Sequence, residues 1–217
     1  MADELCDVAA STGAGGIVVV GDVKHPIVGT PPPIARLVFD VFSTLLHERL
    51  KVRVILGNHD VGLARHLPRE VDVEPVRGYR RGSLGLFHGH AWPSNEVLGA
   101  SRIVTGHLHP GFRFAESSVS GPSKQRCWVR SPLPPAPVSG RRAGRIRARE
   151  TIVLPAFNPL SGVESLNRNA PSRGRSFLVR RFLAEGEARA YLMDGTDLGP
   201  LPSWTNPRAP ERSPPRR

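Results

Sequence analysis

Two apolar segments that each end on glycine and polar residues place the strongest constraint on how this chain can fold. They are GIVVVGD, residues 16–22, and KVRVILGNHD, residues 51–60. Short runs rich in β-branched residues are typical of buried strands. The carboxyl ends of strands in an open α/β sheet are where ligands commonly bind. The pattern therefore predicts an α/β chain in which Asp22 and Asn58 lie at strand ends.

The rest of the first half alternates helical and strand patterns. PPPIARLVFDVFSTLLHERL, residues 31–50, opens on prolines that suit a helix start and then places apolar residues at helical spacing. Three further strands are predicted, within VDVEP (71–75), GSLGLFHGH (82–90) and SRIVTGHLHP (101–110). This alternation is typical of an α/β domain.

The second half changes character, because strand patterns follow one another with almost no helix between them. They are GFRFAES (111–117), QRCWVR (125–130), ARETIVLPAF (148–157), RSFLVRRFLA (175–184) and EARAYLMD (187–194). They predict a second, largely antiparallel sheet. Residues 131–149 are rich in Pro and then in Arg, which predicts a flexible insertion. We expect one domain over residues 1–200 and a disordered Pro/Arg-rich tail over 201–217.

Composition limits where the protein works and what it binds. The longest early apolar run, residues 17–20, is far too short for a membrane span, and two cysteines form no disulfide framework. Both features favour a soluble, cytoplasmic protein without a membrane partner. The net charge of +11 lies wholly in the second half. One stretch of the second half carries five arginines that could contact nucleic-acid phosphates, at positions 141, 142, 145, 147 and 149. An Arg-biased genome would explain them equally well, since only three lysines occur in the chain.

Six of the eight histidines lie in four short blocks: GDVKH (21–25), GNHD (57–60), HGH (88–90) and GHLH (106–109). Each block follows an apolar run, so all four can converge at the ends of neighbouring strands. Carboxylate, amide oxygen and imidazole together suit Mn, Fe or Zn rather than Ca or Mg alone. A single block of this kind more often caps a helix or holds a structural imidazole. Four together favour a divalent metal site of the kind that hydrolyses phosphoesters.

These blocks resemble those of the calcineurin-like metallophosphoesterases. That family's pattern is Asp-x-His, Gly-Asp-x-x-Asp/His, Gly-Asn-His-Asp/Glu, a His-containing block and Gly-His-x-His, and four of the five occur here in order. GDVKH, HGHAWP, TGHLHP and LPAFNPLSG (154–162) look most like the archaeal phosphoesterases related to bacterial ligase-associated phosphoesterases. The resemblance covers residues 17–162. It implies a four-layer α/β/β/α sandwich of two sheets, here with the first strand absent.

The resemblance also implies a role for each candidate residue. Asp22 corresponds to the carboxylate that bridges two metals. Ligands of the second metal correspond to Asn58, His88 and His107, and a ligand of the first metal corresponds to His109. His59 corresponds to the general acid beside the phosphoryl group, with Asp60 orienting its imidazole. His25 and His90 are expected to support the ligands or to face substrate.

One part of the family pattern is missing. No Asp-x-His triplet precedes Asp22, although this block supplies two ligands of the first metal in the family. The simplest explanation is a start codon placed downstream of the true one, or a truncated gene. We expect the loss of that strand to expose a sheet edge.

Together these observations predict a metal-dependent phosphoesterase that hydrolyses a phosphodiester of a nucleotide or nucleic acid with a metal-activated water. It would use two divalent ions, with Mn preferred and Fe, Zn or Ni as alternatives. Because two metal ligands are missing, the alternative is a metal-deficient, catalytically impaired remnant that binds phosphate or nucleic acid. A third hypothesis is that the chain as given does not fold stably.

Overall fold

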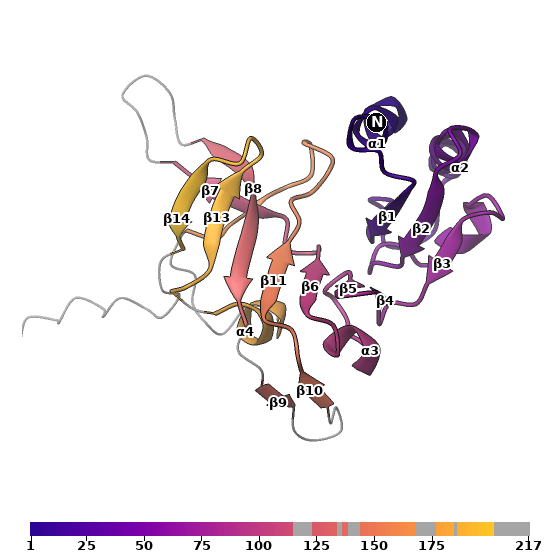
Figure 1. Ribbon diagram of the computed structural model, residues 1–217. Helices are drawn as coiled ribbons and strands as arrows, with labels where there is room; N and C mark the ends of the chain where they lie inside the picture. The colour runs from indigo at the N-terminus through magenta and orange to yellow at the C-terminus, as the bar shows by residue number, and fades with distance from the viewer. Residues whose placement is uncertain (115–122, 134–135, 139–143, 168–176, 185, 202–217) are drawn as a thin grey trace, which may run out of the picture. The chain divides into compact units, whose positions relative to one another are not determined.

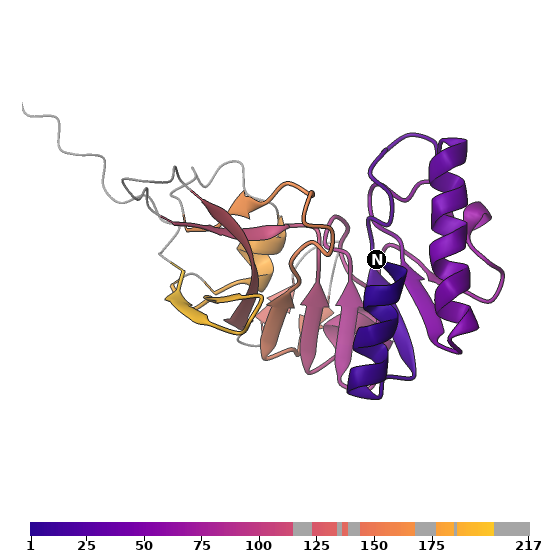
Figure 2. The same cartoon turned by 90° about the horizontal axis from the view of Figure 1, so that it is seen from above.

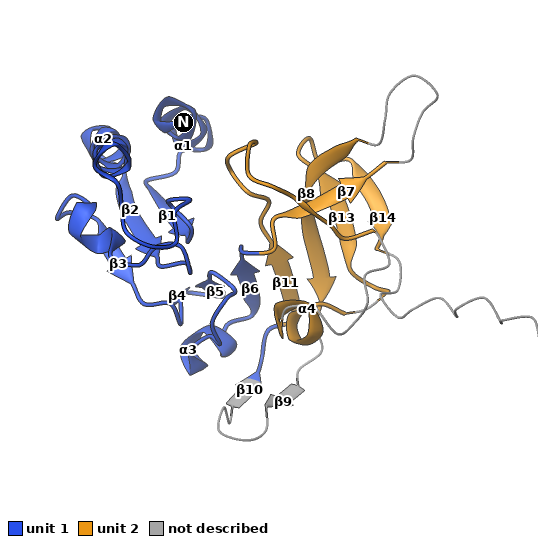
Figure 3. Ribbon diagram, turned by 180° about the vertical axis from the view of Figure 1, so that it is seen from behind, with its two compact units in different colours: residues 1–107, 135–148 blue, residues 108–134, 149–217 orange. Residues whose placement is uncertain are grey.

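The chain is divided into two compact units. The computed structural model describes residues 1–114, 123–133, 136–138, 144–167, 177–184 and 186–201. Unit 1 consists of residues 1–107 and 135–148, and unit 2 of residues 108–134 and 149–217 (Figure 3). None of the helices in these described ranges is long and apolar enough to cross a membrane.

A parallel three-stranded sheet forms the first half of unit 1. Its strands β1 (Gly16–Val20), β2 (Lys51–Ile55) and β3 (Asp72–Glu74) lie in the order β1-β2-β3. Helices α1 (Ala2–Thr12) and α2 (Pro32–His47) lie beside each other along β1 and β2 (Figures 1 and 2). The short helix η1 (Leu63–His66) follows β2. Because β1 and β2 are parallel neighbours, their carboxyl ends lie at the same edge of the sheet.

The buried face of α2 shows why this segment is a helix. Pro32 and Pro33 occupy its first turn, where proline's missing N–H costs nothing. Val38, Phe42 and Leu45 are buried at spacings of four and three residues, so they form one stripe. The stripe packs in a core with Leu50, Val52, Val54, Leu63, Leu67, Val71 and Ala9. Burial of this stripe joins the helix to the sheet.

The remaining strands of unit 1 are β4 (Tyr79–Arg81), β5 (Leu84–Phe87) and β6 (Arg102–Thr105). β4 pairs antiparallel with β5, and β5 pairs parallel with β6, with helix α3 (Asn95–Leu98) between them in sequence. Strands β9 (Ala136–Val138) and β10 (Gly144–Ile146) pair antiparallel. The described part of 131–149, for which the sequence predicts a flexible insertion, therefore contains paired strands.

Unit 2 is built mainly from antiparallel strands. β7 (Pro110–Arg113), β8 (Lys124–Pro132) and β11 (Glu150–Val153) pair in the order β7-β8-β11. β12 (Glu164–Ser165) pairs parallel with β7, while β13 (Arg189–Leu192) pairs with both β8 and β14 (Asp197–Pro200). The predicted α/β chain with a second, largely antiparallel sheet is confirmed.

The prediction of a strand within residues 175–184 is wrong. Residues Phe177–Phe182 form helix α4. Leu178, Val179, Phe182 and Leu183 are buried, whereas Arg180 and Arg181 are exposed. A strand would turn neighbouring residues to opposite faces, while a helix gathers these four apolar side chains on one side. The division into one domain and a tail stays a prediction, and residues 202–217 lie outside the described ranges.

The burial pattern of α4 predicts which substitutions destabilise unit 2. Phe182→Ala removes a side chain that is fully buried, so the free energy of unfolding should fall by about 3–5 kcal/mol. Arg181→Ala, one position away on the exposed side, should change it by less than about 0.5 kcal/mol. Urea denaturation followed by circular dichroism measures both. Similar losses for the two variants would contradict the assigned helical face.

Candidate metal centre

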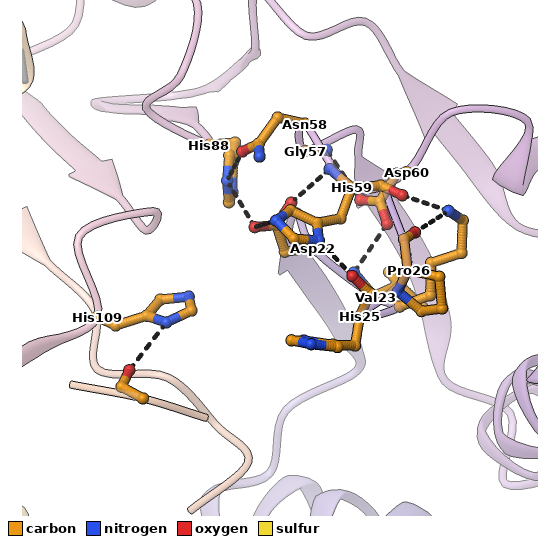
Figure 4. Close-up of polar contacts among 12 residues, drawn as sticks. Asp22, Val23, His25, Pro26, Gly57, Asn58, His59, Asp60, His88 and His109 are labelled. Carbon is orange, nitrogen blue, oxygen red and sulfur yellow. Dashed lines mark hydrogen bonds and ion pairs between the residues drawn. The ribbon is translucent and has the colours of Figure 1, made fainter. Parts of the chain in front are cut away.

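Polar side chains from four strand ends of unit 1 converge at one place. Asp22 follows β1, Asn58 follows β2, His88 follows β5 and His107 follows β6. One ligand atom each from Asp22, His88 and His107 lies within 4.8 Å of the other two. The Asn58 Oδ1 atom lies 3.2 Å from Nε2 of His88 (Figure 4). The sequence-predicted ligands of the second metal are thus brought together.

Two glycines allow the strand ends to approach this closely. Gly21 has a positive φ of 83°, and a Cβ there would lie 2.3 Å from Nδ1 of His88. A Cβ on Gly57 would lie 2.2 Å from Oδ1 of Asp22. Neither distance is possible between real atoms, so any larger residue would push Asp22 or His88 out of place. The glycines before the Asp and the Asn are required by the packing of the site.

Asp60 links the loops that follow β1 and β2. Its carboxylate is buried, with 1% of the residue exposed. Oδ1 accepts a hydrogen bond from the N–H of Val23 at 2.9 Å, and Oδ2 accepts one from the N–H of Gly57 at 2.8 Å. Hydrogen bonds to a charged acceptor are stronger than neutral ones. Asp60 therefore holds the loop of Asp22 against the loop of Asn58.

The Asp22 carboxylate lies among donors on both of its oxygens. Oδ1 accepts the backbone N–H of His59 at 3.0 Å, and Oδ2 lies 3.2 Å from Nε2 of His88. Burial alone would raise the pKa of Asp22, but the hydrogen bonds from His88 and from the N–H of His59, with the charges of both imidazoles, lower it to about 2. The carboxylate is therefore ionised at neutral pH, as a metal ligand must be.

His88 presents one ring nitrogen to the other candidate ligands. Its Nδ1–H donates to the carbonyl of Val20 at 2.8 Å, which orients the ring. Its Nε2 lies 3.2 Å from Oδ2 of Asp22 and 3.2 Å from Oδ1 of Asn58. A bound cation would take the place of the proton that Nε2 donates to Asp22. The set of one carboxylate, one amide oxygen and two imidazoles fits Mn, Fe or Zn.

His90 gives a second indication that a cation binds here. Its ring centroid lies 5.3 Å from that of His88 and 6.2 Å from that of His107. Its buried Nδ1 has no hydrogen-bond partner among the residues that the structure describes. Burial lowers the pKa of His90, and the neighbouring His88 lowers it further, so the ring tends to stay neutral. A buried, unpaired imidazole nitrogen is costly unless something else binds it.

His59 is held beside the carboxylate by backbone groups. Its Nδ1–H donates to the carbonyl of His25 at 2.5 Å, and its Nε2 lies 4.0 Å from Oδ2 of Asp22. The sequence predicts that Asp60 orients this imidazole. In the structure both Asp60 oxygens accept backbone N–H groups instead, and His25 supplies the contact to the ring.

Sequence reasoning missed Lys24. Only 3% of this residue is exposed, and its ammonium donates to the carbonyl of Pro26 at 2.6 Å and to the carbonyl of His59. The residue therefore joins the same two loops as Asp60. The available signal in the sequence was a lysine inside a block of predicted site residues. Lysine is seldom fully buried, so an amine buried between backbone carbonyls is unusual.

Backbone strain is concentrated at the candidate ligands. Among the described non-glycine residues with positive φ are Asp22 at 55°, His107 at 67° and His109 at 43°. Arg49, at 59°, lies outside the site. Such conformations cost about 1–3 kcal/mol each and cluster at functional sites. His109 belongs to unit 2, where its Nδ1–H donates to the carbonyl of Gly162 at 3.1 Å. Its role as a ligand stays a prediction.

The comparison with protein-family models finds no match, and neither does the comparison with curated proteins. Among solved structures, the crystal structure of Pseudomonas putida nuclease MPE is similar, with a TM-score of 0.55 and 21% sequence identity. The match covers 92% of this chain and 76% of that chain. At this identity the likeness shows the fold, and it confirms the predicted α/β sandwich class.

The two hydrogen bonds of Asp60 predict a large loss of stability for Asp60→Asn. The amide keeps one acceptor oxygen but turns an NH₂ group toward a backbone N–H that then has no partner. The free energy of unfolding should fall by about 2–4 kcal/mol. Asp40→Asn is the matched control, because Asp40 lies on α2 with its side chain 63% exposed and should change stability by less than about 0.5 kcal/mol. Equal losses in urea denaturation would refute the linking role of Asp60.

Proposed function

We propose that this protein is a metal-dependent phosphoesterase that hydrolyses a phosphodiester of a nucleotide or nucleic acid. The observation that carries the proposal is the convergence of Asp22, His88 and His107 within 4.8 Å, with the amide oxygen of Asn58 beside them. The fold likeness to a protein described as a nuclease supports a phosphodiester substrate.

Asp22, Asn58, His88 and His107 would hold a divalent cation, with Mn preferred and Fe, Zn or Ni as alternatives. When bound, such a cation supplies Lewis-acid stabilisation of phosphoryl oxygens and activates water. His109 would be a ligand of a second cation. His90, whose Nδ1 has no hydrogen-bond partner in the described part of the chain, would support the cation or face the substrate.

His59 would protonate the leaving oxygen of the phosphodiester. Its Nδ1–H is engaged by the carbonyl of His25, so the proton that it gives up must be on Nε2, the nitrogen that faces Asp22. Lys24 and Asp60 would keep the loop of His59 in register with that of Asp22 through backbone hydrogen bonds.

Metal binding tests the ligand assignment. Asp22→Asn and His88→Gln should each weaken Mn²⁺ binding by at least about 100-fold, since each removes one donor of the converging set. His47→Gln is the control, because His47 is exposed on α2 and outside the site. Isothermal titration calorimetry gives both affinity and stoichiometry. Unchanged Mn²⁺ affinity in both site variants would refute the site. If the wild-type chain binds phosphate but holds one ion or none and hydrolyses no diester, the metal-deficient alternative is favoured.

Leaving-group dependence tests the role of His59. With Mn²⁺ bound, His59→Ala should lower kcat for a dinucleotide, whose leaving alkoxide needs a proton, by about 10²–10⁴-fold. The loss for bis(p-nitrophenyl) phosphate should be much smaller, because nitrophenolate leaves without protonation. Mn²⁺ affinity, measured in parallel, should stay near the wild-type value. Equal losses for the two substrates would exclude a general-acid role.

A further inference from the structure

Three polar groups of His59 are held by the block of residues 22–25. Its backbone N–H donates to Oδ1 of Asp22 at 3.0 Å, its carbonyl accepts the ammonium of Lys24, and its Nδ1–H donates to the carbonyl of His25 at 2.5 Å (Figure 4). Nε2 is the polar atom that remains, on a side chain that is 24% exposed. The block that supplies Asp22 therefore also holds the histidine proposed as the general acid.

Lys24 supports both the backbone and the ring of His59. Its ammonium donates to the carbonyl of His59 and, at 2.6 Å, to the carbonyl of Pro26. Pro26 directly follows His25, whose carbonyl accepts the Nδ1–H of the His59 ring. A proline also restricts the backbone of the residue before it. One ammonium thus fixes the backbone of His59 and the backbone that carries the acceptor for its ring.

Burial keeps water away from these contacts. Only 3% of Lys24 is exposed, so few water molecules can compete for the two carbonyls. A hydrogen bond from a charged donor is about twice as strong as one between neutral groups. The four-carbon stem of lysine lets a single amine reach from one loop to the other. A methionine at this position would fill similar space and leave both carbonyls without their donor.

Packing alone does not fix the direction of the His59 ring. An aromatic neighbour, the ring of His25, has its centroid 5.9 Å away and is tilted by 34°, and His25 is itself exposed. An exposed ring gives little support, so the direction depends on the hydrogen bond to Nδ1. A general acid needs a defined direction, because the leaving oxygen must lie within hydrogen-bond reach of the nitrogen that protonates it.

We infer that Lys24 is a positioning residue for His59 and that it makes diesters with poor leaving groups accessible to this chain. It acts through two backbone carbonyls and does not contact the substrate. The inference rests on the proposed function, because it takes His59 as the general acid. It adds a specificity to that function: loss of Lys24 should impair the hydrolysis of alkyl diesters, whose leaving alkoxide needs a proton, and should spare aryl diesters.

The first measurement observes the His59 ring without metal or substrate. Proton–nitrogen correlation spectra of the full chain in EDTA, above about pH 8, distinguish the two tautomers of a neutral imidazole. The His59 signals are identified by their absence in His59→Gln. The wild-type ring should carry its proton on Nδ1, whereas Lys24→Met should show a mixture of tautomers. Lys51→Met, which changes an exposed lysine of β2, should keep the wild-type spectrum.

The second measurement compares leaving groups with Mn²⁺ bound. Lys24→Met should lower kcat for a dinucleotide by about 10–100-fold, because the proton donor is displaced and not removed. For bis(p-nitrophenyl) phosphate the loss should stay below about 3-fold. Val38→Ala, in the buried stripe of α2, is the stability control, because a merely destabilised chain loses both activities alike.

Two results would overturn the inference: a single Nδ1–H tautomer in Lys24→Met, or equal losses for the two substrates in that variant. Hydrolysis of neither diester by the wild-type chain would refute the proposed function, and the tautomer spectra would still decide whether Lys24 orients His59. Should Lys24→Met fail to fold in thermal melts, Lys24→Gln replaces it with the same two measurements, because it keeps an NH₂ donor on a shorter stem.

Discussion

The buried carboxylate of Asp60 is the interaction on which the candidate centre depends. It accepts one backbone N–H from the loop after β1 and one from the loop after β2, so it sets the spacing between them. That spacing brings Gly57 against Asp22 with no room for a side chain. Lys24 reinforces the same junction through backbone carbonyls. Two loops without regular structure thereby become a rigid platform, which a metal site requires.

The centre itself is energetically costly in the form described by the structure. Asp22 and His107 adopt left-handed backbone conformations, and a nitrogen of His90 is buried without a hydrogen-bond partner among the described residues. The packing of α1 and α2 on the parallel sheet offsets such costs elsewhere in unit 1. A divalent cation would offset them further, because its binding to the converging ligands stabilises the folded chain.

The two units carry different parts of the proposed chemistry. Unit 1 supplies the converging ligands and His59, whereas His109 belongs to unit 2. The uneven charge of the sequence matches this division, since the excess of basic residues lies in the second half. Of the arginines at 141–149 that the sequence suggested as phosphate contacts, 141 and 142 lie outside the described residues.

Local sequence was enough to predict the strands that carry the site, the helix α2 and the blocks in which the candidate ligands occur, because each depends on apolar spacing over a few neighbouring residues. It failed for residues 175–184, where the same apolar residues fit a strand or a helix until packing selected α4. Only the tertiary structure decided which groups meet. His88 donates to Val20, 68 positions away, and the carbonyl of His25 rather than Asp60 contacts the His59 ring. Such contacts are set by how strands and loops pack in three dimensions, which no local pattern contains.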